Sequence, residues 1–80
     1  MRVLLFGRLA DVAGWRERTL DPAPASLAAL RALLAGEDAA LGEALGGKGV
    51  QAAVDKQIVR GDAALASGAE VAFLPPMSGG

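Results

Sequence analysis

The 80-residue chain carries 8 basic and 9 acidic side chains, a net charge of −1, and a hydrophobic fraction of 52% that suffices for one small domain. Cysteine and histidine are both absent, which excludes disulfides, zinc sites built on these residues, cysteine nucleophiles and serine–histidine relays. The basic residues are scattered, and no apolar run approaches the roughly 18 residues of a membrane span. We therefore expect a cytoplasmic protein with neither nucleic acid nor a membrane as a partner.

Hydrophobic periodicity and turn residues define the expected elements. In chain order these are a strand over residues 1–7, a helical turn over residues 9–13, a strand over residues 15–20, the main helix over residues 27–35, a short helix after residue 38, and strands over residues 50–54, 57–59 and 70–74. Ser26 is a good N-cap for the main helix, in which Leu27, Leu30 and Leu34 fall on one face. Gly36 is expected to stop this helix.

The order of these elements predicts an α+β fold of the β-grasp, or ubiquitin-like, type. Asp38 is expected to cap the short helix, and Asp55 and Lys56 to form the turn between the third and fourth strands. The main helix must pack across one face of a mixed sheet of about five strands. We expect a β-grasp domain over residues 1–74, followed by an extended, flexible tail over residues 75–80.

One face of this sheet is expected to remain uncovered. Side chains alternate along a strand, so Leu4 and Phe6 of the first strand lie opposite the face that the helix covers. Leu74 of the last strand shares that uncovered face, with Ile58 as a possible further member. A contiguous apolar patch of this kind often marks a partner site, although folded surfaces are also largely apolar in general.

The last six residues form a second candidate site. Pro75 and Pro76 fix an extended stem, while Gly79 and Gly80 lack side chains and so fit a narrow slot. Fully extended, residues 75–80 reach about 20 Å. Such an arm suits delivery of the Gly80 carboxylate into the active site of another protein; the alternative is an ordinary frayed terminus.

Two further patterns do not favour chemistry of their own. The segment from Gly42 to Lys48 matches the first seven positions of a phosphate-binding loop, but a helix precedes it, a strand follows it, and Gly49 stands where serine or threonine would hold magnesium. We expect a flexible loop there. The neighbouring carboxylates Glu37, Asp38 and Glu43 give no sign of a buried pair with separated pKa values.

The whole chain resembles the MoaD family, the ubiquitin-like small subunits of molybdopterin synthase. Met77 stands where the family more often has valine, and Asp55 where it more often has asparagine. The paired prolines before a small residue and a diglycine are the most specific part of the resemblance. The matching segments are residues 1–6, 9–14, 52–55 and 70–80.

The resemblance implies a non-catalytic sulfur-carrying subunit that binds no cofactor or metal. An E1-like, MoeB-like enzyme would use ATP to adenylate Gly80, next to Gly79, and sulfur would then convert the terminus to a thiocarboxylate. The tail would enter a MoaE-like large subunit, and its sulfur would pass to cyclic pyranopterin monophosphate during molybdenum cofactor biosynthesis. The partner-binding residues would be Phe6, Ile58, Leu74, Pro75, Pro76, Met77 and Ser78.

Other functions remain open at this point. A ThiS-like thiamine carrier, a carrier for tRNA thiolation and a protein-conjugating modifier all share the diglycine ending, so this ending does not decide among them. A plain β-grasp binding module with an inert tail is a further alternative.

Overall fold

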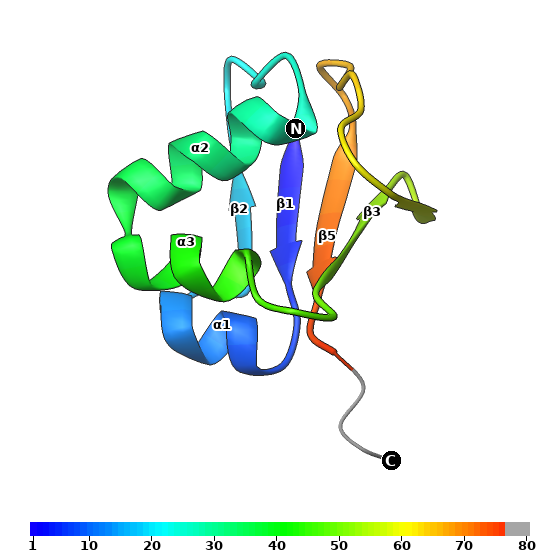
Figure 1. Ribbon diagram of the computed structural model, residues 1–80. Coiled ribbons are helices and arrows are strands. Elements are labelled where there is room, and N and C mark those ends of the chain that lie inside the picture. The colour runs from blue at the N-terminus through cyan, green and yellow to red at the C-terminus, as the bar shows by residue number, and fades with distance from the viewer. Residues whose placement is uncertain (77–80) are drawn as a thin grey trace.

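Five strands form one mixed sheet in the computed structural model, which describes residues 1–76. The strand order is β2-β1-β5-β3-β4; β1 and β5 are parallel, and the other neighbours are antiparallel (Figure 1). The elements are β1 (Arg2–Leu5), α1 (Arg8–Ala13), β2 (Glu17–Thr19), α2 (Leu27–Glu37), α3 (Ala39–Leu45), β3 (Gln51–Val54), β4 (Gln57–Val59) and β5 (Glu70–Leu74). This is the predicted β-grasp arrangement, with the main helix α2 accompanied by two shorter helices.

The core lies between the helices and one face of the sheet (Figure 1). Val3 pairs with Val71 and Leu5 with Phe73 across the two central strands, and all four side chains are buried. Burying such a side chain contributes about 1.5–3 kcal/mol. The leucines that cover them from α2 and α3 are Leu27, Leu30, Leu34, Leu41 and Leu45.

Two side-chain caps position the helices. The Ser26 hydroxyl accepts a hydrogen bond from the Ala29 N–H at 3.1 Å, as predicted for the start of α2. The prediction that Gly36 stops α2 is wrong, because the helix continues through Gly36. Asp38 ends it instead: its extended backbone redirects the chain, and its carboxylate accepts from the Leu41 N–H at 3.1 Å and so caps α3.

The turn between β3 and β4 forms as predicted. Asp55 and Lys56 adopt φ values of +49° and +70°, the left-handed conformation that aspartate tolerates better than most residues. The Asp55 carboxylate also accepts from the Glu70 N–H at 3.0 Å, which ties the hairpin to β5. None of the helices within residues 1–76 has the length and apolarity to cross a membrane.

The first two strands are shorter than expected. The runs over residues 1–7 and 15–20 contract to β1 and β2, whose paired residues run from Arg2–Thr19 to Leu4–Glu17. Phe6 lies just beyond β1, where its N–H donates to the Phe73 carbonyl at 3.2 Å.

Candidate functional site: an open sheet face beside a diproline stem

The sheet face opposite the helices carries a row of apolar side chains. Strand register places one residue from each of β1, β5, β3 and β4 side by side across this face. Because side chains alternate, the residue two positions further along β1 and β5 continues the row toward residue 75. We call this surface the open face; its residues are Leu4, Ala72, Ala53 and Ile58 across the sheet, with Phe6 and Leu74 beyond them.

Exposed apolar area is concentrated on the open face. Phe6 is 46% exposed and Ile58 is 48% exposed. Within the described residues 1–76, the third exposed large apolar side chain is Leu33 on α2, at 38%. Leu74 is half-buried and so less exposed than these three side chains. The structure thus brings Phe6, Ile58 and Leu74 to one face, as the alternation of side chains predicts; their role in partner binding stays a prediction.

The open face is bordered by charge at the end far from the stem. Arg2 forms ion pairs with Glu17 at 3.1 Å and with Glu70 at 3.0 Å, all on exposed or partly exposed side chains. The hydrogen bond from Arg2 holds the pKa of the Glu17 carboxyl below its ordinary value and raises the pKa of the guanidinium. Glu17 pairs with Leu4 across the two strands, so this charged border reaches the middle of the open face, and the apolar end lies beyond it, beside the stem.

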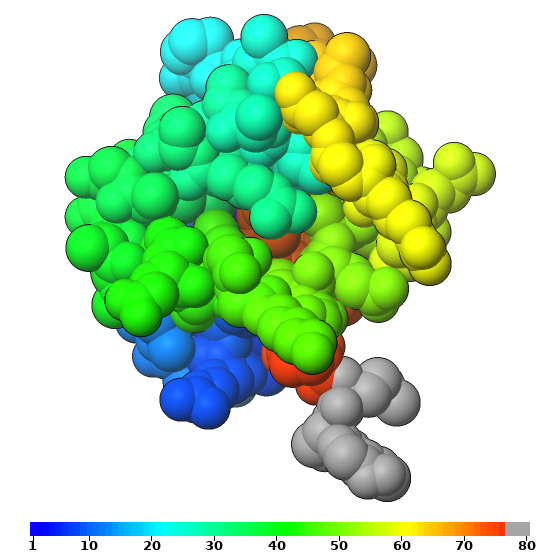
Figure 2. Space-filling model, in the orientation of Figure 1, coloured from blue at the N-terminus to red at the C-terminus, as the bar shows by residue number. Residues whose placement is uncertain are grey.

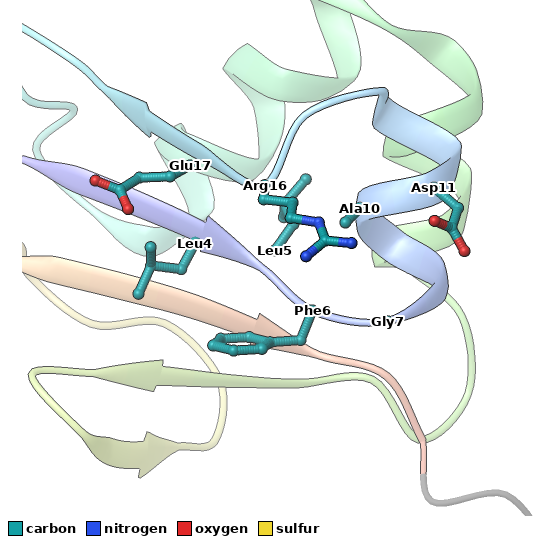
Figure 3. Close-up of a pocket in the computed structure, with 8 residues that line it drawn as sticks. All are labelled: Leu4, Leu5, Phe6, Gly7, Ala10, Asp11, Arg16 and Glu17. Atoms are coloured by element: carbon teal, nitrogen blue, oxygen red, sulfur yellow. The ribbon is translucent and has the colours of Figure 1, made fainter.

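A hollow of about 390 Å³ opens at this apolar end (Figure 3). Leu4 and Phe6 extend to the same side of β1, while Arg16, which immediately precedes β2, also lines the hollow (Figure 3). The hollow therefore offers a partner an apolar wall together with one cation, Arg16, and two carboxylates, Asp11 and Glu17.

The two prolines that follow β5 rest against the domain. Pro75 is half-buried and lies against Gly7, where an added Cβ would come within 3.0 Å of the Pro75 Cγ. Pro76 lies against Gly49, where an added Cβ would come within 2.7 Å of the Pro76 Cβ. Figure 2 shows residues 75–76 in red, with the blue segment that leads into α1 and the green loop before β3 both adjoining them. We call Pro75 and Pro76 the stem, and Gly7 and Gly49 the cradle.

Sequence reasoning missed the cradle. The expectation of a flexible loop covers the segment from Gly42 to Lys48, and the sequence gives no sign that Gly7 or Gly49 approaches a proline. Gly42 instead lies within α3, so the first part of the segment from Gly42 to Lys48 is helical and forms no phosphate-binding loop.

A groove of about 380 Å³ runs beside the stem, between α1, α3 and the loop before β3. Both prolines line it, together with apolar side chains of the two helices and the exposed charged residues Arg8, Lys48 and Glu43. A partner that surrounds the stem would therefore contact the open face on one side and this groove on the other.

The remaining predicted site residues lie outside the described part of the chain. These are Met77, Ser78, Gly79 and Gly80. Their predicted roles, including that of the Gly80 carboxylate, stay predictions, as does the division of the chain at residue 74.

The β2-β1-β5-β3-β4 sheet, its helical layer and the stem after β5 define a ubiquitin-like β-grasp protein. The family model of the ThiS family matches residues 3–80. The chain therefore belongs to the ThiS family and is a small ubiquitin-like carrier or modifier, not itself an enzyme.

Solved structures agree with this assignment. The crystal structure of SAMP1 from Haloferax volcanii is 30% identical, with a TM-score of 0.82 over 100% of this chain and 98% of that chain. A second structure of this small archaeal modifier protein 1 is 27% identical, with a TM-score of 0.80 over 96% and 97%. The solution structure of SAMP1 from Methanosarcina acetivorans, 22% identical with a TM-score of 0.83 over 99% and 94%, shows likeness of fold alone. No curated protein matches the chain in sequence.

Proposed function

We propose that this protein is a sulfur carrier whose Gly80 carboxylate is activated by an E1-like adenylating enzyme at the expense of ATP. The observation that carries the proposal is the juxtaposition of an exposed apolar face with a stem held at the end of β5, on a chain of the ThiS family. The face gives an activating enzyme a surface to bind. The stem places the start of the last four residues beside that surface.

The chemistry follows from the weak reactivity of a carboxylate toward nucleophiles. A carboxylate oxygen of Gly80 attacks the α-phosphorus of ATP, and pyrophosphate leaves. A sulfur donor at the oxidation level of hydrosulfide then attacks the acyl carbon, and AMP leaves with the electron pair of the broken carbon–oxygen bond. The product is a thiocarboxylate that carries nucleophilic sulfur. Glycine at this position leaves the acyl carbon unhindered.

The specific role that we propose is that of the small subunit of molybdopterin synthase. A MoaE-like subunit would bind the open face and receive the stem and the residues after it. The thiocarboxylate sulfur would attack a side-chain carbon of cyclic pyranopterin monophosphate and displace an oxygen substituent, which leaves with the electron pair of the broken carbon–oxygen bond. Water would then cleave the bond between the sulfur and the Gly80 acyl carbon. This leaves sulfur on the pterin and returns the carboxylate. The Pro75–Pro76 stem and the resemblance of residues 70–80 to MoaD endings support this role.

A second candidate function is protein conjugation. The 30% identity to SAMP1, a small archaeal modifier protein, favours it specifically. Here the amine of a lysine on a target protein attacks the Gly80 acyl adenylate, AMP leaves, and an isopeptide bond joins the two proteins. Both candidates use the same activated terminus, so they differ only in the nucleophile.

Intact-mass spectrometry tests the shared step. The protein is incubated with an E1-like enzyme, Mg-ATP and sulfide, and the variant lacking Gly80 serves as the control. We expect the mass of the full chain to increase by the difference between the masses of sulfur and oxygen, and the mass of the control variant to stay unchanged. An unchanged mass on the full chain would refute the carrier proposal.

A second experiment separates the two candidates. Tagged protein is recovered from its own cells under denaturing conditions and, separately, under native ones. A MoaE-like subunit in the native eluate, with the carrier recovered free of adducts, supports the synthase role. Isopeptide-linked lysines in the denatured sample would instead establish the modifier role and defeat the synthase assignment.

A further inference from the structure

Gly7 and Gly49 are distinguished from other glycines by what they touch. Both adopt positive φ angles, +55° and +85°, and both pack against a proline of the stem. Gly14 and Gly61 adopt similar positive angles, +82° and +80°, but an added Cβ would meet nothing within 4 Å. Left-handed backbone alone therefore explains Gly14 and Gly61, whereas the cradle glycines combine such backbone with close approach to another segment.

We propose that the cradle glycines are positioning residues that fix the direction in which the chain leaves the domain after Pro76. The effect of the cradle on reaction rate rests on the proposed carrier function. The packing of the stem against the two glycines does not depend on that function. Proline already restricts φ to about −65°, so contacts at Pro75 and Pro76 determine most of the remaining freedom of the stem. The two contacts come from segments far apart in the sequence, Gly7 before α1 and Gly49 before β3, and each meets a different proline of the stem.

The size of the effect follows from the contact at Gly49. A methyl group on Gly49 would lie 2.7 Å from the Pro76 Cβ, whereas carbon atoms pack at about 3.5–4.0 Å. Pro76 must therefore shift by about 1 Å in the Gly49→Ala variant. A misplacement of about 1 Å that arises far from the reacting atoms can cost up to about a hundredfold in rate. We expect a loss of about tenfold to a hundredfold in kcat for modification of the terminus.

The geometry is tested first on the protein alone. In the wild type, nuclear Overhauser contacts should join the Gly49 α-protons to Pro76. In Gly49→Ala, the Cα–Hα residual dipolar couplings of residues 74 to 76 should change relative to those of the sheet, since the two prolines carry no amide proton. Gly61→Ala is the matched control, because it introduces the same backbone strain without the contact, and its couplings should stay as in the wild type. Unchanged couplings in Gly49→Ala, or absent contacts in the wild type, would overturn the cradle.

The consequence is then tested with an activating enzyme, Mg-ATP and sulfide. Gly49→Ala should lower kcat while KM stays within about twofold, because the open face is untouched. Gly61→Ala should leave both constants unchanged. The variant Pro76→Gly lacks the Cβ that faces Gly49, and we expect it to have a lower kcat than the wild type. Adding Gly49→Ala to this variant should lower kcat no further. Pro76→Gly also keeps the test informative if Gly49→Ala fails to fold.

The outcomes separate this inference from the function on which it rests. If the wild type is not modified at all, the carrier proposal fails, and the dipolar couplings still decide whether the cradle exists. If the wild type is modified and Gly49→Ala reacts at the wild-type rate, the positioning role is wrong although the carrier function stands. Equal losses in Gly49→Ala and Gly61→Ala would reduce the effect to backbone strain and likewise refute the positioning role.

Discussion

The replacement of Phe6 by aspartate tests whether the open face binds the activating enzyme. Phe6 is 46% exposed, so a partner can still bury about half of a side chain whose full area is about 200 Å². About 90 Å² at 25 cal/mol/Å² corresponds to about 2 kcal/mol, or roughly thirtyfold in Kd. Leaving a carboxylate in a dry interface adds to this cost. We therefore expect Phe6→Asp to weaken binding at least thirtyfold.

Leu33 provides the matched control. It is a large apolar side chain with a similar exposed fraction, 38%, but it lies on α2, in the helical layer away from the open face. Leu33→Asp changes the net charge by the same amount and removes a comparable apolar surface. We expect its affinity for the partner to stay within about twofold of the wild type, since affinities at separate sites are independent.

Isothermal titration calorimetry with the activating enzyme, at one ionic strength for all three proteins, measures these affinities. Thermal unfolding of each variant verifies that the fold is intact. If Leu33→Asp weakened binding as much as Phe6→Asp, the loss would be due to charge and not to the open face. If Phe6→Asp bound like the wild type, our assignment of the docking surface would be wrong.

Two further predictions concern stability. Gly36 and Gly42 both lie in helices, but a Cβ on Gly42 would sit 2.5 Å from the Ala35 Cβ, whereas one on Gly36 meets nothing. In urea unfolding, Gly42→Ala should lower the free energy of unfolding by about 1–3 kcal/mol, and Gly36→Ala should raise it by about 0.5–1 kcal/mol. A change of the same sign in both variants would contradict this prediction. The hydrogen bond from Arg18 lowers the pKa of Glu37, so this pair stabilises the fold above the ordinary carboxyl range, and the contribution is lost as the pH falls through the lowered value. In Arg18→Gln, NMR titration of the Glu37 carboxyl carbon should show a higher pKa, and an unchanged one would argue against the ion pair.

The elements and faces of this fold could be predicted because their signals are local. The alternation in β1 sends Val3 into the core and leaves Leu4 on the open face, and both burials agree with it. Ser26 and Asp38 cap helices because their side chains reach amides three residues away. The sheet order has no such signal, since β5 lies between β1 and β3 only through pairing across almost the whole chain.

The glycines mark the limit of prediction from sequence. A glycine in a sequence indicates conformational freedom, but it does not indicate which backbone angle or close contact requires that freedom. Gly36 was expected to end a helix and lies inside one, while Gly42 allows α3 to approach Ala35 of α2. Nothing in the sequence around Gly49 indicates its approach to Pro76. These reasons depend on neighbours that are distant in sequence or set by packing, so only the structure reveals them.

The pairing of β1 with β5 couples recognition of this protein to presentation of its terminus. The Phe6 N–H donates to the Phe73 carbonyl at 3.2 Å, so the exposed ring lies two residues from the start of the stem along the neighbouring strand. A partner that holds Phe6 therefore also holds the base of the stem, while Gly49 sets the direction from there. Changes at the open face should consequently act on KM and changes at the cradle on kcat. Because the two act on different steps, the losses in kcat/KM of Phe6→Asp and Gly49→Ala should multiply in the double variant. A double variant no worse than the poorer single one would mean that face and cradle work as one unit.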